Sequence, residues 1–132
     1  MPKQRSSLKF LKYADTFKTY RANDVIFHEG EQGDMMYVVK AGTVELRVLG
    51  RVVETLEAGE MLGEMALVDN EARSASAIAI TDCQLVPIDR EKFQFLIRET
   101  PYVAIEVMQI MARRLRRMNQ DTAILRRLPE RK

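Results

Sequence analysis

The chain has 132 residues, of which 46% are hydrophobic and 30% charged, and its formal net charge is +2. This is enough for one globular domain with a substantial core, so we expect a single domain over residues 1–132. One cysteine and one histidine exclude a disulfide framework and a metal site of several histidines, and the lack of a long apolar run or an apolar signal-peptide core predicts a cytoplasmic protein without a membrane span.

A short helix is the first predicted element. Ser6 can cap it, and apolar residues at helical spacing follow over residues 6–13.

From residue 16 to about residue 88, short β-favouring runs alternate with glycine-containing turns. The predicted strands cover residues 24–28, 36–40, 43–49, 51–56, 76–81 and 83–88. Many short strands at even spacing predict a compact antiparallel sandwich or barrel. Four glycines are interpreted as turn residues in it: Gly30, Gly33, Gly42 and Gly50.

Residues 62–75 combine a glycine turn, a carboxylate at the start of a short helix-like segment, and an arginine. Gly63 lets backbone approach a ligand closely. The first N–H groups of a helix have no internal partner and carry positive partial charge, which suits an anion. Arg73 adds a planar set of donors that matches phosphate oxygens. We interpret the segment as a site for a sugar phosphate, with the Glu64 carboxylate as an acceptor for hydroxyl groups.

Each of these residues also has a structural interpretation. A carboxylate such as Glu64 stabilises any helix N-terminus. Arg73 could form a surface ion pair with Asp69 or Glu71, and the Ser74 hydroxyl could cap backbone in a turn.

Two helices are predicted from about residue 89 to residue 127. Asp89 is a suitable cap for the first, and Pro101 suits the start of the second, which extends to about residue 125. The second helix carries two apolar stripes. The first, which we expect to pack on the β-structure, contains Val103, Val107 and Ile110. The second has the four- and three-residue spacing of a coiled-coil seam and contains Ala104, Met108, Met111, Leu115, Met118, Thr122 and Leu125.

The seam predicts a homodimer, with folding back over the chain's own barrel as the alternative. Residues 99–132 contain 8 Lys and Arg against 4 Asp and Glu, including a cluster of four arginines, Arg113, Arg114, Arg116 and Arg117. Such a cluster is interpreted as a solvated face or as a contact for an acidic protein, lipid headgroups or nucleic acid. Direct DNA binding is not expected, because no DNA-reading element follows the helix.

The order of these elements resembles the cyclic-nucleotide-binding domain family of bacterial catabolite activator proteins, protein kinase A regulatory subunits and cyclic-nucleotide-gated channels. The resemblance covers roughly residues 17–119 and includes two motifs. Residues 25–39, VIFHEGEQGDMMYVV, are similar to the early strands and turns of the family, and residues 62–75 are similar to its phosphate-binding cassette. The resemblance implies an α+β, mainly β fold: an antiparallel, jelly-roll-like β-roll over about 16–88, a short N-terminal helix and two C-terminal helices.

The resemblance also implies roles for single residues. Glu64 would accept a hydrogen bond from the ribose 2′-hydroxyl. Arg73 would pair with the cyclic phosphate, helped by the Ser74 hydroxyl and by backbone N–H groups near Glu64, Met65 and Ala66. Gly63 and Ala75 of the same segment would also be ligand-binding residues. In the family, a residue of the last helix reaches the base, and Asn119 is the best candidate here, with Arg116 second. Ala72 and Leu62 depart from the proline and phenylalanine of many members, which puts affinity in doubt.

The leading hypothesis is a non-catalytic regulatory module that binds cyclic AMP or cyclic GMP and couples binding to movement of the C-terminal helices, without a cofactor. We favour cyclic AMP, because the Arg-Ser-Ala pattern of residues 73–75 resembles that of the adenine-binding activators. Alternatives are a dimerising adaptor that does not use nucleotide, and the sensor part of a longer regulator or channel. A cupin-like metal oxygenase is disfavoured, because it would need two or three histidines and the chain has only His28.

Overall fold

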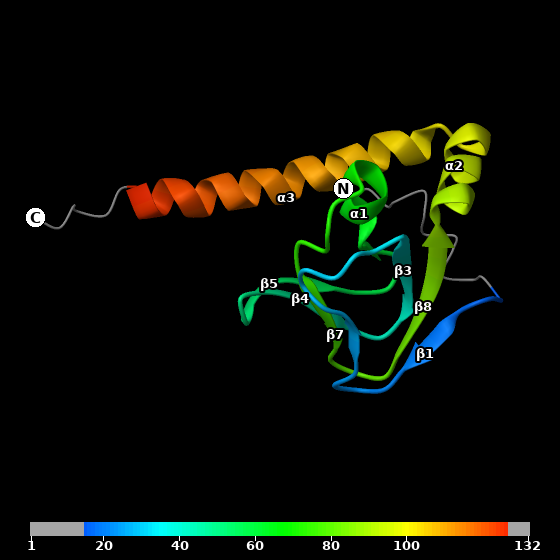
Figure 1. Ribbon diagram of the computed structural model, residues 1–132, viewed down its shortest axis with the longest axis horizontal. Helices are drawn as coiled ribbons and strands as arrows, with labels where there is room; N and C mark the ends of the chain where they lie inside the picture. Colours follow the sequence, from blue (N-terminus) through cyan, green and yellow to red (C-terminus); the bar gives the residue numbers. More distant parts are fainter. Residues whose placement is uncertain (1–14, 127–132) are drawn as a thin grey trace, which may run out of the picture.

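The computed structural model describes the backbone of residues 15–126 and the side chains of residues 15–117 (Figure 1). Eight strands and three helices follow one another in the order β1 (Lys18–Tyr20), β2 (Val25–Phe27), β3 (Met35–Ala41), β4 (Val44–Val48), β5 (Arg51–Leu56), β6 (Met61–Leu62), α1 (Glu64–Asp69), β7 (Ser76–Ala79), β8 (Cys83–Asp89), α2 (Arg90–Glu99) and α3 (Tyr102–Arg126). The helix expected over residues 6–13 lies outside the described residues.

The strands form two antiparallel four-stranded sheets, in the orders β1-β8-β3-β6 and β2-β7-β4-β5. The mainly β, antiparallel roll is confirmed, as two sheets rather than a closed barrel. All six predicted strands are present with small differences at their ends. Strands β1 and β6 were not predicted, because runs of three and two residues are too short to show a period.

Two hydrophobic clusters explain the side-chain pattern of the strands. One cluster fills the space between the sheets, and the other lies between the β1-β8-β3-β6 sheet and the helices. Strand β3 contributes to both, since Met36 and Val38 belong to the helical cluster while Tyr37 and Val39 belong to the cluster between the sheets. A strand buried on both faces reads as a continuous apolar run, whereas Val44 and Leu46 of β4 show the alternation of a strand with one buried face.

Helix α2 begins as the sequence predicts. The Asp89 side chain accepts a hydrogen bond of 2.8 Å from the backbone N–H of Lys92, and Phe93 and Leu96 enter the helical cluster. At the end of α2, the N–H of Thr100 donates to the carbonyl of Leu96, and α3 follows at once.

Helix α3 crosses the roll and extends beyond it (Figure 1). Val103 and Val107 are buried and Ile110 packs against the same cluster, which confirms the first predicted stripe. On the predicted seam, Met108 and Leu115 are more than half exposed. The side chains from residue 118 onward lie outside the described residues. In the described part of the chain, no helix is both long and apolar enough to cross a membrane.

Candidate functional site

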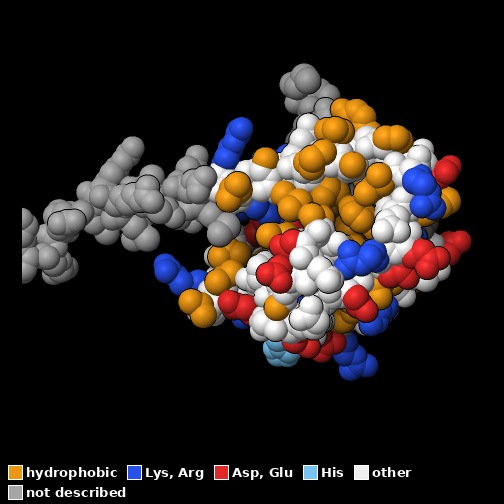
Figure 2. All heavy atoms as spheres, turned by 45° about the horizontal axis from the view of Figure 1, so that its top comes forward, with side chains coloured by type: hydrophobic (Ala, Val, Ile, Leu, Met, Phe, Trp, Pro, Cys, Tyr) orange, Lys and Arg blue, Asp and Glu red, His pale blue; other side chains and the backbone are white. Residues whose placement is uncertain are grey.

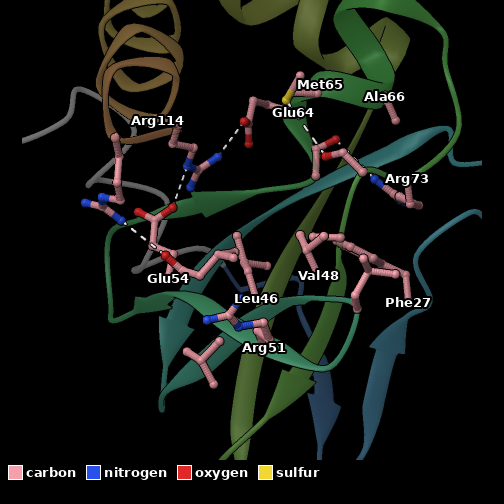
Figure 3. A pocket seen from close by; sticks show the side chains of 17 residues that line it. Phe27, Leu46, Val48, Arg51, Glu54, Glu64, Met65, Ala66, Arg73 and Arg114 are labelled. Atoms are coloured by element: carbon pink, nitrogen blue, oxygen red, sulfur yellow. Dashed lines mark hydrogen bonds and ion pairs between the residues drawn. The ribbon is translucent and has the colours of Figure 1, made fainter. Parts of the chain in front are cut away.

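A cavity of about 770 Å³ opens between the β4–β5 hairpin, the segment from α1 to β7, and the middle of α3 (Figure 3). Seven residues predicted for the site line it: Gly63, Glu64, Met65, Ala66, Arg73, Ser74 and Ala75. Figure 3 shows Arg73 and Phe27 on one side of the cavity and Arg114 with Glu54 on the other.

Gly63 positions the start of α1 beside the cavity. Its φ of 79° lies in the left-handed region, which favours glycine. A Cβ at this position would also lie 2.6 Å from Nη1 of Arg73 and 3.2 Å from the carbonyl oxygen of Met35. The residue before Glu64 is therefore glycine for two reasons, backbone conformation and space.

Arg73 is buried, with 7% of its surface exposed. Its Nη1 donates to the carbonyl of Gly63 at 3.1 Å and its Nη2 donates to the carbonyl of Met35 at 2.7 Å. Burial lowers the pKa of the guanidinium, and nearby acidic groups, with Tyr37 foremost, oppose this shift. A guanidinium has five N–H groups and stays protonated in proteins, so these two bonds leave donors that an anion in the cavity can use.

A backbone ladder fixes the segment that carries Arg73. The N–H of Arg73 donates to the carbonyl of Glu31 at 2.7 Å, and the N–H of Gly30 donates to the carbonyl of Arg73 at 2.8 Å. In the described residues, Asp69 does not pair with Arg73 but accepts from the backbone N–H of Glu71. The loop between β2 and β3 therefore holds Arg73 at the cavity.

The interpretation of Gly33 as a turn residue is wrong. Its φ is not positive, but a Cβ there would lie 2.3 Å from Nε and 2.4 Å from Cζ of Arg73. Gly33 is thus needed because the guanidinium packs directly against its backbone. Spacing alone could not reveal this, since the contact joins residues that are 40 positions apart.

Glu64 is 1% exposed and its two carboxylate oxygens differ. Oε2 accepts from Nη1 of Arg114, while Oε1 is buried and has no hydrogen-bond partner among the described residues. An unpaired buried oxygen of this kind is unfavourable and calls for a donor. The carboxylate is therefore held by protein through Oε2, while Oε1 is the oxygen left without a partner.

Arg114 connects α3 to this carboxylate and to the β4–β5 hairpin (Figure 3). Its Nε donates to Oε1 of Glu54 at 2.7 Å, and its Nη2 donates to the carbonyl of Met61 at 3.0 Å. Burial alone would lower the pKa of Arg114, but the carboxylates of Glu64 and Glu54 outweigh burial and raise it. Arg114 is therefore a fixed positive charge that ties the helix to the site.

Sequence reasoning assigned Arg114 and Arg117 to a basic cluster and missed them as site residues. Their helical phase was the signal, because the buried stripe at 103, 107 and 110 continues to 114 and 117 at the same four- and three-residue spacing. Arg117 accordingly lines the cavity and donates to the carbonyl of Val53 at 3.4 Å.

Of the two residues predicted to contact a base, only Arg116 has a described side chain. Arg116 is exposed and is absent from the lining, and the side chain of Asn119 lies outside the described residues. Ser74 does line the cavity, where its hydroxyl lies 3.9 Å from the sulfur of Met65.

The charge of the lining favours an anion. Four arginines, Arg51, Arg73, Arg114 and Arg117, face the cavity with two carboxylates, Glu54 and Glu64. Within the described residues there is no group of three or more His, Cys, Asp or Glu side chains that could hold a metal ion. The arrangement suits a ligand that carries a negative charge and also offers a hydroxyl donor to Glu64.

Comparison with known proteins agrees with this chemistry. The family model described as "Cyclic nucleotide-binding domain" matches residues 17–100. The "Cyclic AMP receptor protein" of Thermus thermophilus is 38% identical over 113 residues, which cover 82% of this chain and 52% of that protein. A cAMP-dependent protein kinase regulatory subunit of Candida albicans is 34% identical over 62% of this chain and 18% of its own length.

Solved structures give the same result. The catabolite activator protein of Thermus thermophilus superposes with a TM-score of 0.77 at 34% identity, covering 90% of this chain and 63% of that one. The cAMP-bound PfPKA-R superposes with a TM-score of 0.74 at 26% identity, covering 86% and 43%. The chain spans about half the length of the cyclic AMP receptor protein it matches. On the family model, the relatives and the shared fold, the chain belongs to the cyclic nucleotide-binding domain family.

Proposed function

We propose that the chain is a regulatory module that binds a cyclic nucleotide in the cavity between α1, the β4–β5 hairpin and α3. Arg73 pairs with the cyclic phosphate, with backbone around Gly63, Met65 and Ala66 close to it. Glu64 accepts a hydrogen bond from the ribose 2′-hydroxyl. The observation that carries the proposal is the buried, unpaired Oε1 of Glu64, a residue that lines the same cavity as Arg73.

The same proposal assigns the regulatory output to α3. Arg114 of α3 already holds the other oxygen of Glu64, so a ligand that occupies Oε1 acts on a carboxylate that contacts the helix directly. A ligand shifts a conformational equilibrium only by its different affinity for the two states. In one placement of α3, Arg114 pairs with Glu64, and in the other it does not. The Glu64 carboxylate, which binds the ribose, therefore has a different partner in each placement, and this can give the two states different affinities for the ligand. No catalytic step is part of the proposal.

A homodimer through α3 belongs to the proposal as well. Ile105, Met108 and Leu115 are exposed along the helix, and Figure 2 shows hydrophobic side chains gathered on the helical side of the molecule. A second copy of the chain would cover this surface with its own α3.

The second candidate is an adaptor that dimerises without nucleotide. The pairing of Arg114 with Glu64 and Glu54 favours it, because this pairing satisfies much of the polar lining without a ligand. The adaptor leaves Oε1 of Glu64 unexplained, and for that reason we place it second.

A thermal-shift experiment separates the two candidates. Cyclic AMP at about 100 times its dissociation constant should stabilise the folded chain by roughly 2.7 kcal/mol. Cyclic AMP, cyclic GMP and the non-cyclic 5′-AMP are compared on the wild type and on Arg73→Ala. We expect a shift with cyclic AMP that is largely lost in Arg73→Ala. No shift with either cyclic nucleotide at millimolar concentration would favour the adaptor.

A further inference from the structure

The guanidinium of Arg73 lies in a cradle formed by one aromatic ring, two glycines and two carbonyl groups. We propose that Phe27, at the end of β2, is a positioning residue that fixes this guanidinium for the phosphate of the ligand. The inference rests on the proposed function, because that function makes Arg73 the phosphate-binding group. It concerns a residue that sequence reasoning treated only as part of a strand.

The first observation is the contact itself. Cζ of Arg73 lies 4.1 Å from the centroid of the Phe27 ring, well within the range of about 6 Å for a cation–π interaction. Phe27 is 8% exposed, so water screens this contact little. An aliphatic side chain of similar size would fill the same space without offering a negatively polarised face.

The ring is itself held in place. Tyr37 of β3 stacks on it, with ring centroids 6.4 Å apart and planes inclined by 23°. Tyr37 is also buried, at 7% exposure, and both rings belong to the hydrophobic cluster between the sheets. Phe27 is therefore anchored in the core through its cluster and its contact with Tyr37, and its ring packs against the guanidinium of Arg73.

The remaining sides of the guanidinium leave it little freedom. A Cβ on Gly33 would lie 2.3 Å from Nε, and a Cβ on Gly63 would lie 2.6 Å from Nη1, so backbone closes on it at both places. The carbonyls of Gly63 and Met35 accept from its terminal nitrogens. Removing the ring opens one side of this cradle and allows Arg73 to occupy other rotamers.

Rotational freedom of Arg73 in the free chain would weaken binding. A ligand must then order a long side chain that the wild type already holds in place. The ordering of one such side chain corresponds to about a 2- to 10-fold change in dissociation constant. The ring therefore improves affinity by holding the Arg73 guanidinium in its binding position.

The alternative is that Phe27 only fills the core, and a matched control addresses it. Phe93 is equally buried, at 8%, but belongs to the helical cluster and does not line the cavity. Phe27→Leu and Phe93→Leu are the same substitution at equal burial, so a general loss of stability affects both. Phe27→Tyr retains the ring face and serves as the conservative rescue.

Two readouts are measured on the full chain: the dissociation constant of cyclic AMP by titration calorimetry, and the NMR resonance of the Arg73 Nε–H, assigned by its absence in Arg73→Lys. A proton of a guanidinium stacked on a ring shifts upfield. We expect Phe27→Leu to lose this upfield shift and to bind cyclic AMP about 2- to 10-fold more weakly. Phe27→Tyr should retain the upfield shift and the wild-type affinity. Phe93→Leu should lose thermal stability with unchanged affinity.

Three results would overturn the inference: unchanged affinity in Phe27→Leu, an equal loss in Phe27→Tyr, or an equal loss in Phe93→Leu. A wild type that shows the upfield Nε–H but binds no cyclic nucleotide would instead overturn the proposed function, since the ring would then hold an arginine that binds no phosphate.

Discussion

Replacement of Arg114 by methionine tests how strongly α3 is held to the site. Methionine keeps most of the length of the side chain and removes its charge and donors. The substitution removes the ion-pair partner of Glu64, whose side chain is 1% exposed, and it also removes the ion-pair partner of Glu54. The structure therefore predicts that the variant leaves a buried carboxylate without compensation.

The magnitude follows from burial. Breaking a fully buried ion pair by removing one partner typically costs about 3–5 kcal/mol. The side chains of Arg114 and Glu54 are 17% and 18% exposed, so water can compensate part of this loss. We expect a decrease in the free energy of unfolding of about 2–4 kcal/mol for Arg114→Met.

Glu64→Gln should have a smaller effect, because Arg114 keeps Glu54 and the Met61 carbonyl as acceptors. In the double variant no charge is left unpaired at position 64, so the two effects should not add. We expect a coupling of about 1–3 kcal/mol.

Urea unfolding of the four chains measures this cycle, with Arg113→Met as the control, since Arg113 is exposed on the same helix. The control should change stability by no more than about 0.5 kcal/mol. Additivity of Arg114→Met and Glu64→Gln within about 0.5 kcal/mol would refute the reasoning.

Three further predictions follow from the described contacts. Gly33→Ala should weaken cyclic AMP binding by at least about 10-fold, because its Cβ would displace the Arg73 guanidinium; calorimetry that finds wild-type affinity would show that Arg73 can move without loss. Arg90→Met should reduce the free energy of unfolding by about 1–2 kcal/mol, because Arg90 donates to the Leu67 carbonyl and the Asn70 side chain at the end of α1; an unchanged urea midpoint would argue against this. Burial raises the pKa of Tyr37 and of Tyr20 above the ordinary value of 10.0. The folded state therefore holds these protons more tightly, and the resulting stabilisation is complete below pH 10 and is lost as the pH rises through the raised pKa values. Between pH 9 and 11, the free energy of unfolding of Tyr37→Phe should therefore decline less than that of the wild type.

Much of the fold could be predicted from the sequence because the strands and turns leave local signals. The alternation of Val44 and Leu46 and the cap at Asp89 agree with the structure. Strand β6 left no such signal, because its two residues become a strand only by pairing with Tyr37 and Val38. Pairing between distant segments is a tertiary effect that local propensity does not contain.

The candidate site could be predicted only where its residues are adjacent in sequence. Residues 63–66 and 73–75 form one segment, so their chemistry was visible together. Arg114 was judged by its charged neighbours rather than by its helical phase, and so its contact with Glu64 was missed. Phe27 and Gly33 act on Arg73 through packing, and the sequence contains no pattern for a contact that the fold creates.

The measurement that tests the central claim most directly is calorimetric titration with cyclic AMP and with its 2′-deoxy analogue. These ligands differ only in the 2′-hydroxyl, from which Glu64 is proposed to accept a hydrogen bond. We expect the wild type to bind cyclic AMP at least about 10-fold more tightly than the analogue, because the analogue leaves the buried Oε1 unpaired. In Glu64→Ala this preference should largely disappear. An equal preference in both chains, or no binding of cyclic AMP by the wild type, would contradict the account.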